Sequence, residues 1–169
     1  MNYDSMSIFE KDLLKSEANY IPQSPLSWIK RSADIFPNKT AVVHGDRKFT
    51  WEQTFSRCQQ LASALRRIGI RKGDTVAVIA TNIPAFYEAL FAIPALGAVI
   101  NPINIRLDSE AIEFILQHGE AKAILVDSDF AGVTKAAVEG LKNKPFIIDI
   151  ADINAQNHQR IGDVEYEEF

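Results

Sequence analysis

Apolar residues recur at helical spacing in two segments near the start of the chain. The first segment, 24–36, places its apolar residues on one side of a helix, and Pro37 would end that helix. The second segment, 51–67, follows Thr50, which forms a capping box with the glutamine three residues later. Gly69 is the kind of residue that ends a helix in a left-handed conformation. The pattern therefore predicts two amphipathic helices.

Between and after these helices, apolar runs of strand length predict a sheet. Two short runs at 40–44 and 47–50 flank a Gly-Asp pair, which predicts a β-hairpin. The later runs predict strands at 74–80, 98–101, 121–126 and 145–150, separated by a helix opened by Asn82 and Pro84 and by helices at 108–118 and 130–141. This alternation predicts parallel βαβ units with helices covering the sheet. The predicted fold class is α/β, with a partly parallel sheet, flanking helices and an N-terminal β-hairpin.

The two ends of the chain carry weaker patterns. We expect residues 1–22 to form an N-terminal arm and residues 23–169 to form the folded part. After Ile150 the sequence becomes polar and acidic, and no closing strand or capped helix is predicted. We therefore expect the chain to be truncated relative to a longer protein, and a naturally short protein is the alternative.

Composition and charge exclude several classes of protein. Apolar residues make up 47% of the chain, which is enough for a core, and the net charge of −4 with scattered Lys and Arg argues against nucleic-acid binding. The single cysteine, Cys58, lies in an apolar helical pattern, so we expect it to be buried and not catalytic. Trp28 and Trp51 are interpreted as packing anchors. Because the sequence shows neither a signal-peptide core nor a membrane-spanning run, we expect a cytoplasmic location.

The known motifs for nucleotide binding and nucleophilic catalysis do not occur in the sequence. There is no G-x-G-x-x-G, no G-x-x-x-x-G-K-[ST] and no G-x-S-x-G, and the three histidines lack metal-ligand spacing. Asp127 or Asp129 is interpreted as a helix cap, since a metal site or a receiver-like domain needs more acidic groups. Asn104 and Arg106 follow a predicted parallel strand and are our candidates for a substrate crevice. A solvated turn held by the asparagine side chain is the alternative there.

Four stretches of sequence occur in a characteristic order and spacing. They are 36–43 (FPNKTAVV), 49–53 (FTWEQ), 69–77 (GIRKGDTVA) and 95–104 (ALGAVINPIN). Together they resemble the start of an adenylate-forming, AMP-binding enzyme of the superfamily of acyl-CoA synthetases, luciferases and peptide-synthetase adenylation domains. The second and fourth stretches resemble the first and second core motifs of that superfamily. Residues 20–22, 25–27 and 104–108 further resemble the branch of short- and medium-chain fatty acyl-CoA ligases.

The resemblance implies that the chain is the N-terminal portion of an AMP-binding domain, the first subdomain of the adenylate-forming fold. The whole enzyme would join a fatty acid or related carboxylate to ATP, giving an acyl-adenylate and pyrophosphate, and CoA would then displace AMP. Mg²⁺ would steady the charge on the phosphates. The phosphate loop, the adenine and ribose motifs, the hinge and the catalytic lysine of that superfamily are not in this sequence. We therefore expect no catalytic, cofactor-binding or metal-binding residue here, and an isolated chain that is inactive and binds no cofactor.

Two alternatives remain open. The chain could be a truncated homologue that acts alone as a protein-interaction module. It could also belong to an adenylating enzyme that passes its acyl group to another acceptor, such as a carrier protein or oxygen. A homo-oligomer is compatible with each of these readings.

Overall fold

The computed structural model describes residues 23–156 and 159–169, so the predicted arm at 1–22 lies outside the described residues. The elements, in chain order, are α1 Pro25–Ile35, β1 Thr40–His44, β2 Arg47–Thr50, α2 Trp51–Arg67, β3 Thr75–Ile79, α3 Pro84–Ala95, β4 Val99–Pro102, α4 Ser109–His118, β5 Ala121–Asp127, the short 3-10 helix η3 Ser128–Phe130, α5 Ala131–Glu139, β6 Phe146–Ile150 and β7 Val164–Glu165. In the part of the chain that the structure describes, no helix combines the length and the apolar character needed to cross a membrane.

The first elements form for the local reasons that the sequence indicates. Strands β1 and β2 pair as an antiparallel hairpin, and Gly45 in its turn has a φ of +56°. At the start of α2, the Thr50 hydroxyl accepts a hydrogen bond from the Gln53 backbone N–H at 3.2 Å. The Gln53 side chain accepts one from the Thr50 N–H at 2.9 Å, which completes the predicted capping box. Gly69, with a φ of +99°, follows the end of the helix as predicted.

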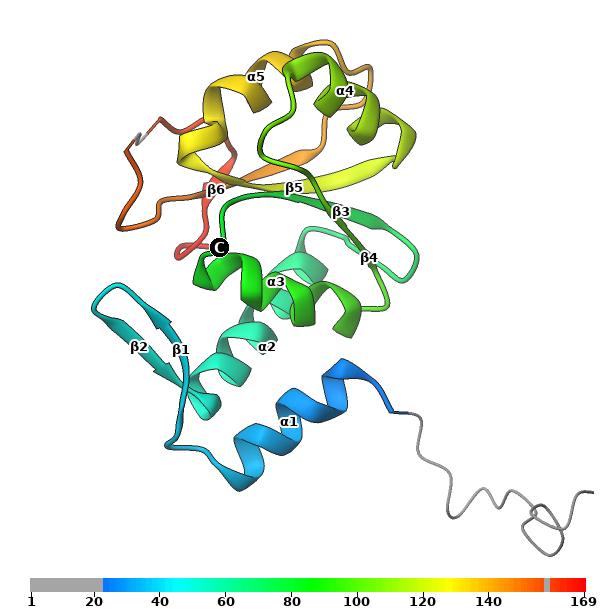
Figure 1. Cartoon of the computed structure of the whole chain (residues 1–169). Coiled ribbons are helices and arrows are strands. Elements are labelled where there is room, and N and C mark those ends of the chain that lie inside the picture. The colour runs from blue at the N-terminus through cyan, green and yellow to red at the C-terminus, as the bar shows by residue number, and fades with distance from the viewer. Residues whose placement is uncertain (1–22, 157–158) are drawn as a thin grey trace, which may run out of the picture.

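The remaining strands form one five-stranded sheet in the order β4-β3-β5-β6-β7, and every neighbouring pair is parallel. Successive residues of β3 point to opposite faces, as strand geometry requires. Val76 and Val78 join the core that the sheet forms with α2 and α3, whereas Ala77 and Ile79 join the core that it forms with α4 and α5. Figure 1 shows these two helix layers on either side of the sheet. The predicted α/β class is therefore confirmed.

The polar segment after Ile150 does form a strand, which corrects our prediction that it offers none. β7, Val164–Glu165, pairs in parallel with β6. The prediction missed β7 because two residues are too few to show an alternation of apolar and polar positions. Contacts with residues elsewhere in the fold hold this strand in the sheet. The buried Asp149 carboxylate accepts hydrogen bonds from the N–H groups of Ile161 and Gly162, at 3.1 and 2.8 Å, and so holds the returning chain beside β6.

The interpretation of Trp28 as a packing anchor is also wrong. Its side chain lies on α1 and is 63% exposed. Trp51 is half-buried at the start of α2, and Cys58 is buried in the same helix as predicted.

Candidate functional site

The carboxyl ends of β3 and β5 meet where the chain changes direction within the sheet. After β3 the chain enters α3, which packs on one face, and after β5 it enters α5, which packs on the other (Figure 1). Open parallel sheets commonly bind ligands outside the carboxyl ends of their strands at such a switch point. This edge of the sheet is therefore the candidate functional site.

A buried carboxylate joins the two strand ends at the switch point. Asp127, which is 2% exposed, accepts a hydrogen bond from the Thr81 hydroxyl at 3.2 Å through Oδ2. Its Oδ1 accepts another from the Asp129 N–H at 3.2 Å, so the predicted role of Asp127 as a cap is confirmed for the short helix η3. The neighbouring Ser128 hydroxyl is buried and has no hydrogen-bond partner among the described residues. The edge thus combines a satisfied carboxylate with one unsatisfied hydroxyl.

A second polar cluster ties the hairpin to the same edge. The Nε2 atom of His44, at the end of β1, lies 2.8 Å from Oδ1 of Asp152, which follows β6. The Asn154 side-chain nitrogen lies 3.2 Å from the same ring atom, and the Asn154 N–H donates to Asp152 Oδ2 at 2.9 Å. His44 and Asp152 are 108 residues apart in the chain, so no sequence spacing could have predicted this contact.

An apolar pocket of about 280 Å³ separates the hairpin from the start of α3. It is lined by Val42, Val43, His44, Asn82, Ile83, Pro84, Phe86, Tyr87 and Leu90. The N-cap of α3 is Ile83, which has no side chain able to bond the first turn, and Pro84 takes the first helical position. The pocket therefore borders the candidate edge and has mainly apolar walls.

The predicted crevice residues lie in the loop that follows β4, the edge strand of the sheet. Asn104 and Arg106 are both exposed, and the Asn104 side-chain oxygen accepts a hydrogen bond from the Arg106 backbone N–H at 3.0 Å. This bond is the local turn that we considered as the alternative. Their place beyond the carboxyl end of a parallel strand agrees with the prediction, and their part in binding stays a prediction.

Two observations concern metal ligands and nucleophiles among the described residues. Among residues 23–156 and 159–169 there is no group of three or more His, Cys, Asp or Glu side chains that could hold a metal ion. Burial raises the pKa of the Cys58 thiol to about 12, so this thiol is not a nucleophile at neutral pH.

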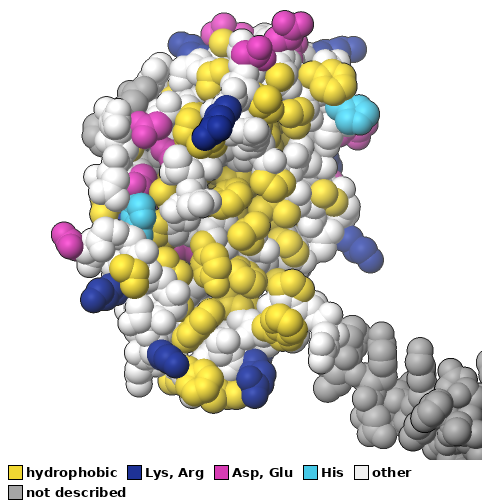
Figure 2. Space-filling model, viewed as in Figure 1, with side chains coloured by type: hydrophobic (Ala, Val, Ile, Leu, Met, Phe, Trp, Pro, Cys, Tyr) yellow, Lys and Arg dark blue, Asp and Glu magenta, His cyan; other side chains and the backbone are white. Residues whose placement is uncertain are grey.

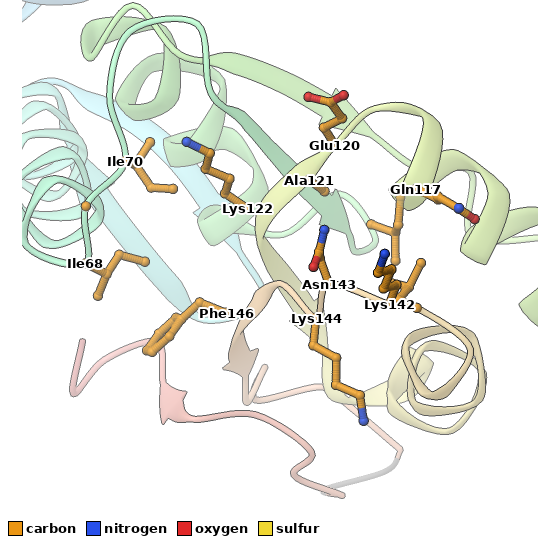
Figure 3. A pocket seen from close by; sticks show the side chains of 13 residues that line it. Ile68, Ile70, Gln117, Glu120, Ala121, Lys122, Lys142, Asn143, Lys144 and Phe146 are labelled. Atoms are coloured by element: carbon orange, nitrogen blue, oxygen red, sulfur yellow. The ribbon is translucent and has the colours of Figure 1, made fainter.

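A cavity of about 720 Å³ lies at the opposite, amino edge of the sheet. Figure 3 shows Ile68, Ile70 and Phe146 on one side of it and Gln117, Asn143 and Lys142 on the other. The helices α2, α4 and α5 all end beside it, and their C-terminal carbonyl groups carry partial negative charge. Lys122, Lys142 and Lys144 line the cavity, and Lys122 pairs with Asp74 at 2.7 Å. Lys122 therefore has a partner within the chain, and the cavity is assigned no ligand.

A buried ionic network lies between α2, α3 and the last residues of the chain. Arg57 Nε donates to Glu88 Oε1 at 2.6 Å, and the other guanidinium nitrogens donate to Glu167 at 3.0 and 2.7 Å. The Tyr166 hydroxyl donates to the second oxygen of Glu88. Burial alone would lower the pKa of Arg57, but its hydrogen bonds to the two carboxylates raise it above the ordinary value. Sequence analysis missed this network because its members are 31 to 110 residues apart.

The fold and its edge define a class of protein: an open α/β domain with polar groups at the switch point and no glycine-rich phosphate loop of its own. Comparison with known proteins identifies the family. The model of the AMP-binding enzyme family matches residues 29–166, and the chain belongs to this family.

The relatives are much longer proteins. An acetate–CoA ligase of Humulus lupulus is 42% identical over 170 aligned positions, and the alignment covers 94% of this chain and 30% of the relative. A trans-cinnamate–CoA ligase of Petunia hybrida is 43% identical over 151 residues, covering 89% of this chain and 25% of the relative. The solved structure of a Mycobacterium tuberculosis fatty acyl CoA synthetase matches with a TM-score of 0.65 and 29% identity, covering 71% of this chain and 24% of that one. The resemblance inferred from sequence motifs is confirmed.

Proposed function

We propose that this chain forms the N-terminal part of the AMP-binding domain of a carboxylate–CoA ligase. The match of residues 29–166 to the AMP-binding family is the observation that carries the proposal. The whole protein would convert a carboxylate, ATP and CoA into an acyl-CoA, AMP and pyrophosphate. Adenylation would come first, because a carboxylate is a poor electrophile until it bears a good leaving group.

The matching motifs support a scaffolding role for this part of such an enzyme. The stretch 69–77 leads into β3, and the stretch 95–104 leads into β4. The two are joined by a hydrogen bond of 2.9 Å from the Gly73 N–H to the Gly97 carbonyl, where both glycines have positive φ. A bond of 2.8 Å from the Val99 N–H to the Asp74 carbonyl follows it. These motifs therefore fix the register of the two strands rather than the chemistry.

The motifs that the superfamily is expected to use for ATP do not occur in this sequence. Among residues 23–156 and 159–169 no three or more His, Cys, Asp or Glu side chains group together, and the sequence includes no known phosphate-binding loop motif. We therefore propose that ATP, Mg²⁺ and CoA bind groups outside this chain and that the isolated chain is inactive. Asn104 and Arg106 remain our candidates for contacts that this chain makes at the crevice.

The names of the relatives indicate a class of carboxylate substrate. Relatives named for acetate, butyrate, trans-cinnamate and benzoate are similar to this chain to nearly the same degree. This similarity supports a fatty acid or another small carboxylate as the substrate class, and it does not separate these acids. We propose a cytoplasmic location, although several relatives are named as peroxisomal.

A fusion protein tests the proposal. The aligned 170 residues of the Humulus lupulus acetate–CoA ligase would be replaced by this chain, and thioester formation would be measured with acetate, ATP and CoA. We expect the folded fusion to make acetyl-CoA, whereas the isolated chain makes none and shows no heat of ATP–Mg²⁺ binding in calorimetry. A folded fusion without activity would favour the interaction-module alternative. Micromolar ATP binding by the isolated chain would contradict the proposal that ATP binds groups outside this chain.

A further inference from the structure

Helix α3 is apolar on all sides, and part of its surface stays exposed although it packs on α1, α2 and the sheet. Its single charged residue, Glu88, is buried toward α2 and paired with Arg57. The opposite side carries the partly exposed side chains Phe86, Tyr87, Leu90 and Phe91. A helix that is apolar all round is normally enclosed on every side. In the described part of the chain, α3 lacks the second layer that its sequence indicates.

Two hollows lie beside this partly exposed side. The pocket between the hairpin and α3, described above, includes Leu90 and Val43, which are 39% and 62% exposed. A groove of about 350 Å³ between α1, α2 and the second half of α3 includes Phe91. We call Val43, Phe86, Tyr87, Leu90 and Phe91 the α3 face. Figure 2 shows hydrophobic side chains gathered in the middle of the molecule in this view, with charged side chains mainly toward its rim.

The α3 face is ordered and continuous with the candidate site. The rings of Tyr87 and Phe91 pack edge to face, with centroids 5.2 Å apart. His44 and Asn82 line the same pocket, so the face reaches the carboxyl edge of the sheet. Contiguous apolar patches on a protein surface commonly mark contacts with other polypeptide.

We infer that the α3 face is the surface on which the rest of the AMP-binding domain packs, and this inference rests on the proposed function. The occupant is the polypeptide that the relatives have outside the aligned region. The matched part is 30% or less of the length of the curated relatives, so most of such a protein lies outside it. A face without charged side chains suits a permanent contact rather than a transient one. Packing there would place the added polypeptide beside the carboxyl end of β3, where the ligand crevice is expected.

The experiment compares one substitution in two contexts. Leu90→Glu would be introduced into the isolated chain and into the fusion with the Humulus lupulus ligase, and thermal unfolding would be followed for both. Because Leu90 is 39% exposed here, we expect the Tm of the isolated chain to change by less than about 2 °C. In the fusion the new carboxylate would be buried, and we expect a loss of at least about 5 °C.

Phe114→Glu is the matched control, since Phe114 is 65% exposed on α4, on the other side of the sheet. We expect it to leave the Tm of both proteins unchanged. An equal effect of Leu90→Glu in the two contexts, or an equal effect of Phe114→Glu in the fusion, would overturn the inference. Light scattering would also detect a dimer of the isolated chain. If Leu90→Glu dissociates that dimer and does not destabilise the fusion, a second copy of the chain occupies the α3 face and the inference is wrong.

The outcomes also separate this inference from the proposed function. An inactive but folded fusion that Leu90→Glu destabilises would support the packing surface and contradict the activity. An active fusion whose Tm is insensitive to Leu90→Glu would support the activity and contradict the packing surface. If the fusion does not fold, the chain and the separately purified remainder of the ligase would be mixed and their binding measured by calorimetry. Binding that Leu90→Glu weakens at least tenfold is expected, and no binding by the wild-type chain would refute the inference.

Discussion

Replacing Arg57 by methionine tests the energetic role of the buried network directly. Glu88 is 2% exposed, and its carboxylate is held by Arg57 and by the Tyr166 hydroxyl. The variant would leave this buried charge with Tyr166 as its remaining partner. It would also remove the cation–π contacts of the guanidinium with Phe49 and Tyr166.

The expected cost follows from these contacts. Removing one partner of a buried ion pair costs about 3–5 kcal/mol. The bonds to Glu167 add little, because that side chain is 52% exposed and exposed pairs contribute about 0–1 kcal/mol. Since Arg57 is itself 21% exposed, water can reach part of the gap, and we expect a loss of about 3 kcal/mol in the free energy of unfolding. For a chain of this size that loss corresponds to about 6–12 °C in Tm.

The assay is urea unfolding of the wild-type chain and three variants, followed by circular dichroism. Arg57→Met combined with Glu88→Leu should recover most of the loss, because it removes the uncompensated charge and leaves the Tyr166 hydroxyl without its partner at a cost of about 1 kcal/mol. Lys30→Met, which breaks the exposed pair with Asp34, should cost no more than about 0.5 kcal/mol. The reasoning is refuted if Arg57→Met lies within about 1 kcal/mol of the wild type, or if the double variant is no more stable than Arg57→Met.

Three further predictions follow from single contacts. The hydrogen bond from Arg57 holds the pKa of Glu167 below its ordinary value of 4.5. The stabilisation by ionised Glu167 is therefore present above about pH 4.5 and is lost as the pH falls through the lower pKa of the folded state. Glu167→Gln should flatten the decline of the unfolding free energy in acid, and an unchanged pH profile would contradict this. The Cys58 thiol, whose pKa burial raises to about 12, should react with a disulfide reagent at pH 8 only after unfolding, and rapid labelling of the native chain would show the assigned burial to be wrong. Gly162→Ala should destabilise the chain, because the new Cβ would lie 2.7 Å from the Ile147 carbonyl oxygen. Gly132→Ala, on the open side of α5, should stabilise the chain by about 0.5–1 kcal/mol. Urea midpoints of the two variants that shift in the same direction would contradict this contrast.

Two polar clusters hold the carboxyl edge of the sheet together. Asp127 is hydrogen-bonded across the switch point, and His44 is bonded to Asp152 between the hairpin and the loop after β6. Both clusters hold separate segments in fixed positions at the edge where ligands bind in such sheets. A rigid edge of this kind is what a ligand site built partly from other polypeptide requires.

The sequence by itself determined the elements whose stabilising contacts are local. The capping box of Thr50, the turn at Gly45 and the apolar runs of the central strands depend on neighbours within a few residues, and each is found where it was predicted. The family could be recognised for the same reason, because its motifs are stretches of ten residues or fewer.

Only the tertiary structure decided the contacts between distant parts of the chain. The Arg57 network, the pairing of His44 with Asp152 and the two-residue strand β7 all depend on residues that are far apart in the sequence. The exposure of Trp28 and of the α3 face has the same origin. Hydrophobic periodicity shows that a side chain prefers burial, but the neighbouring layer determines whether anything covers it.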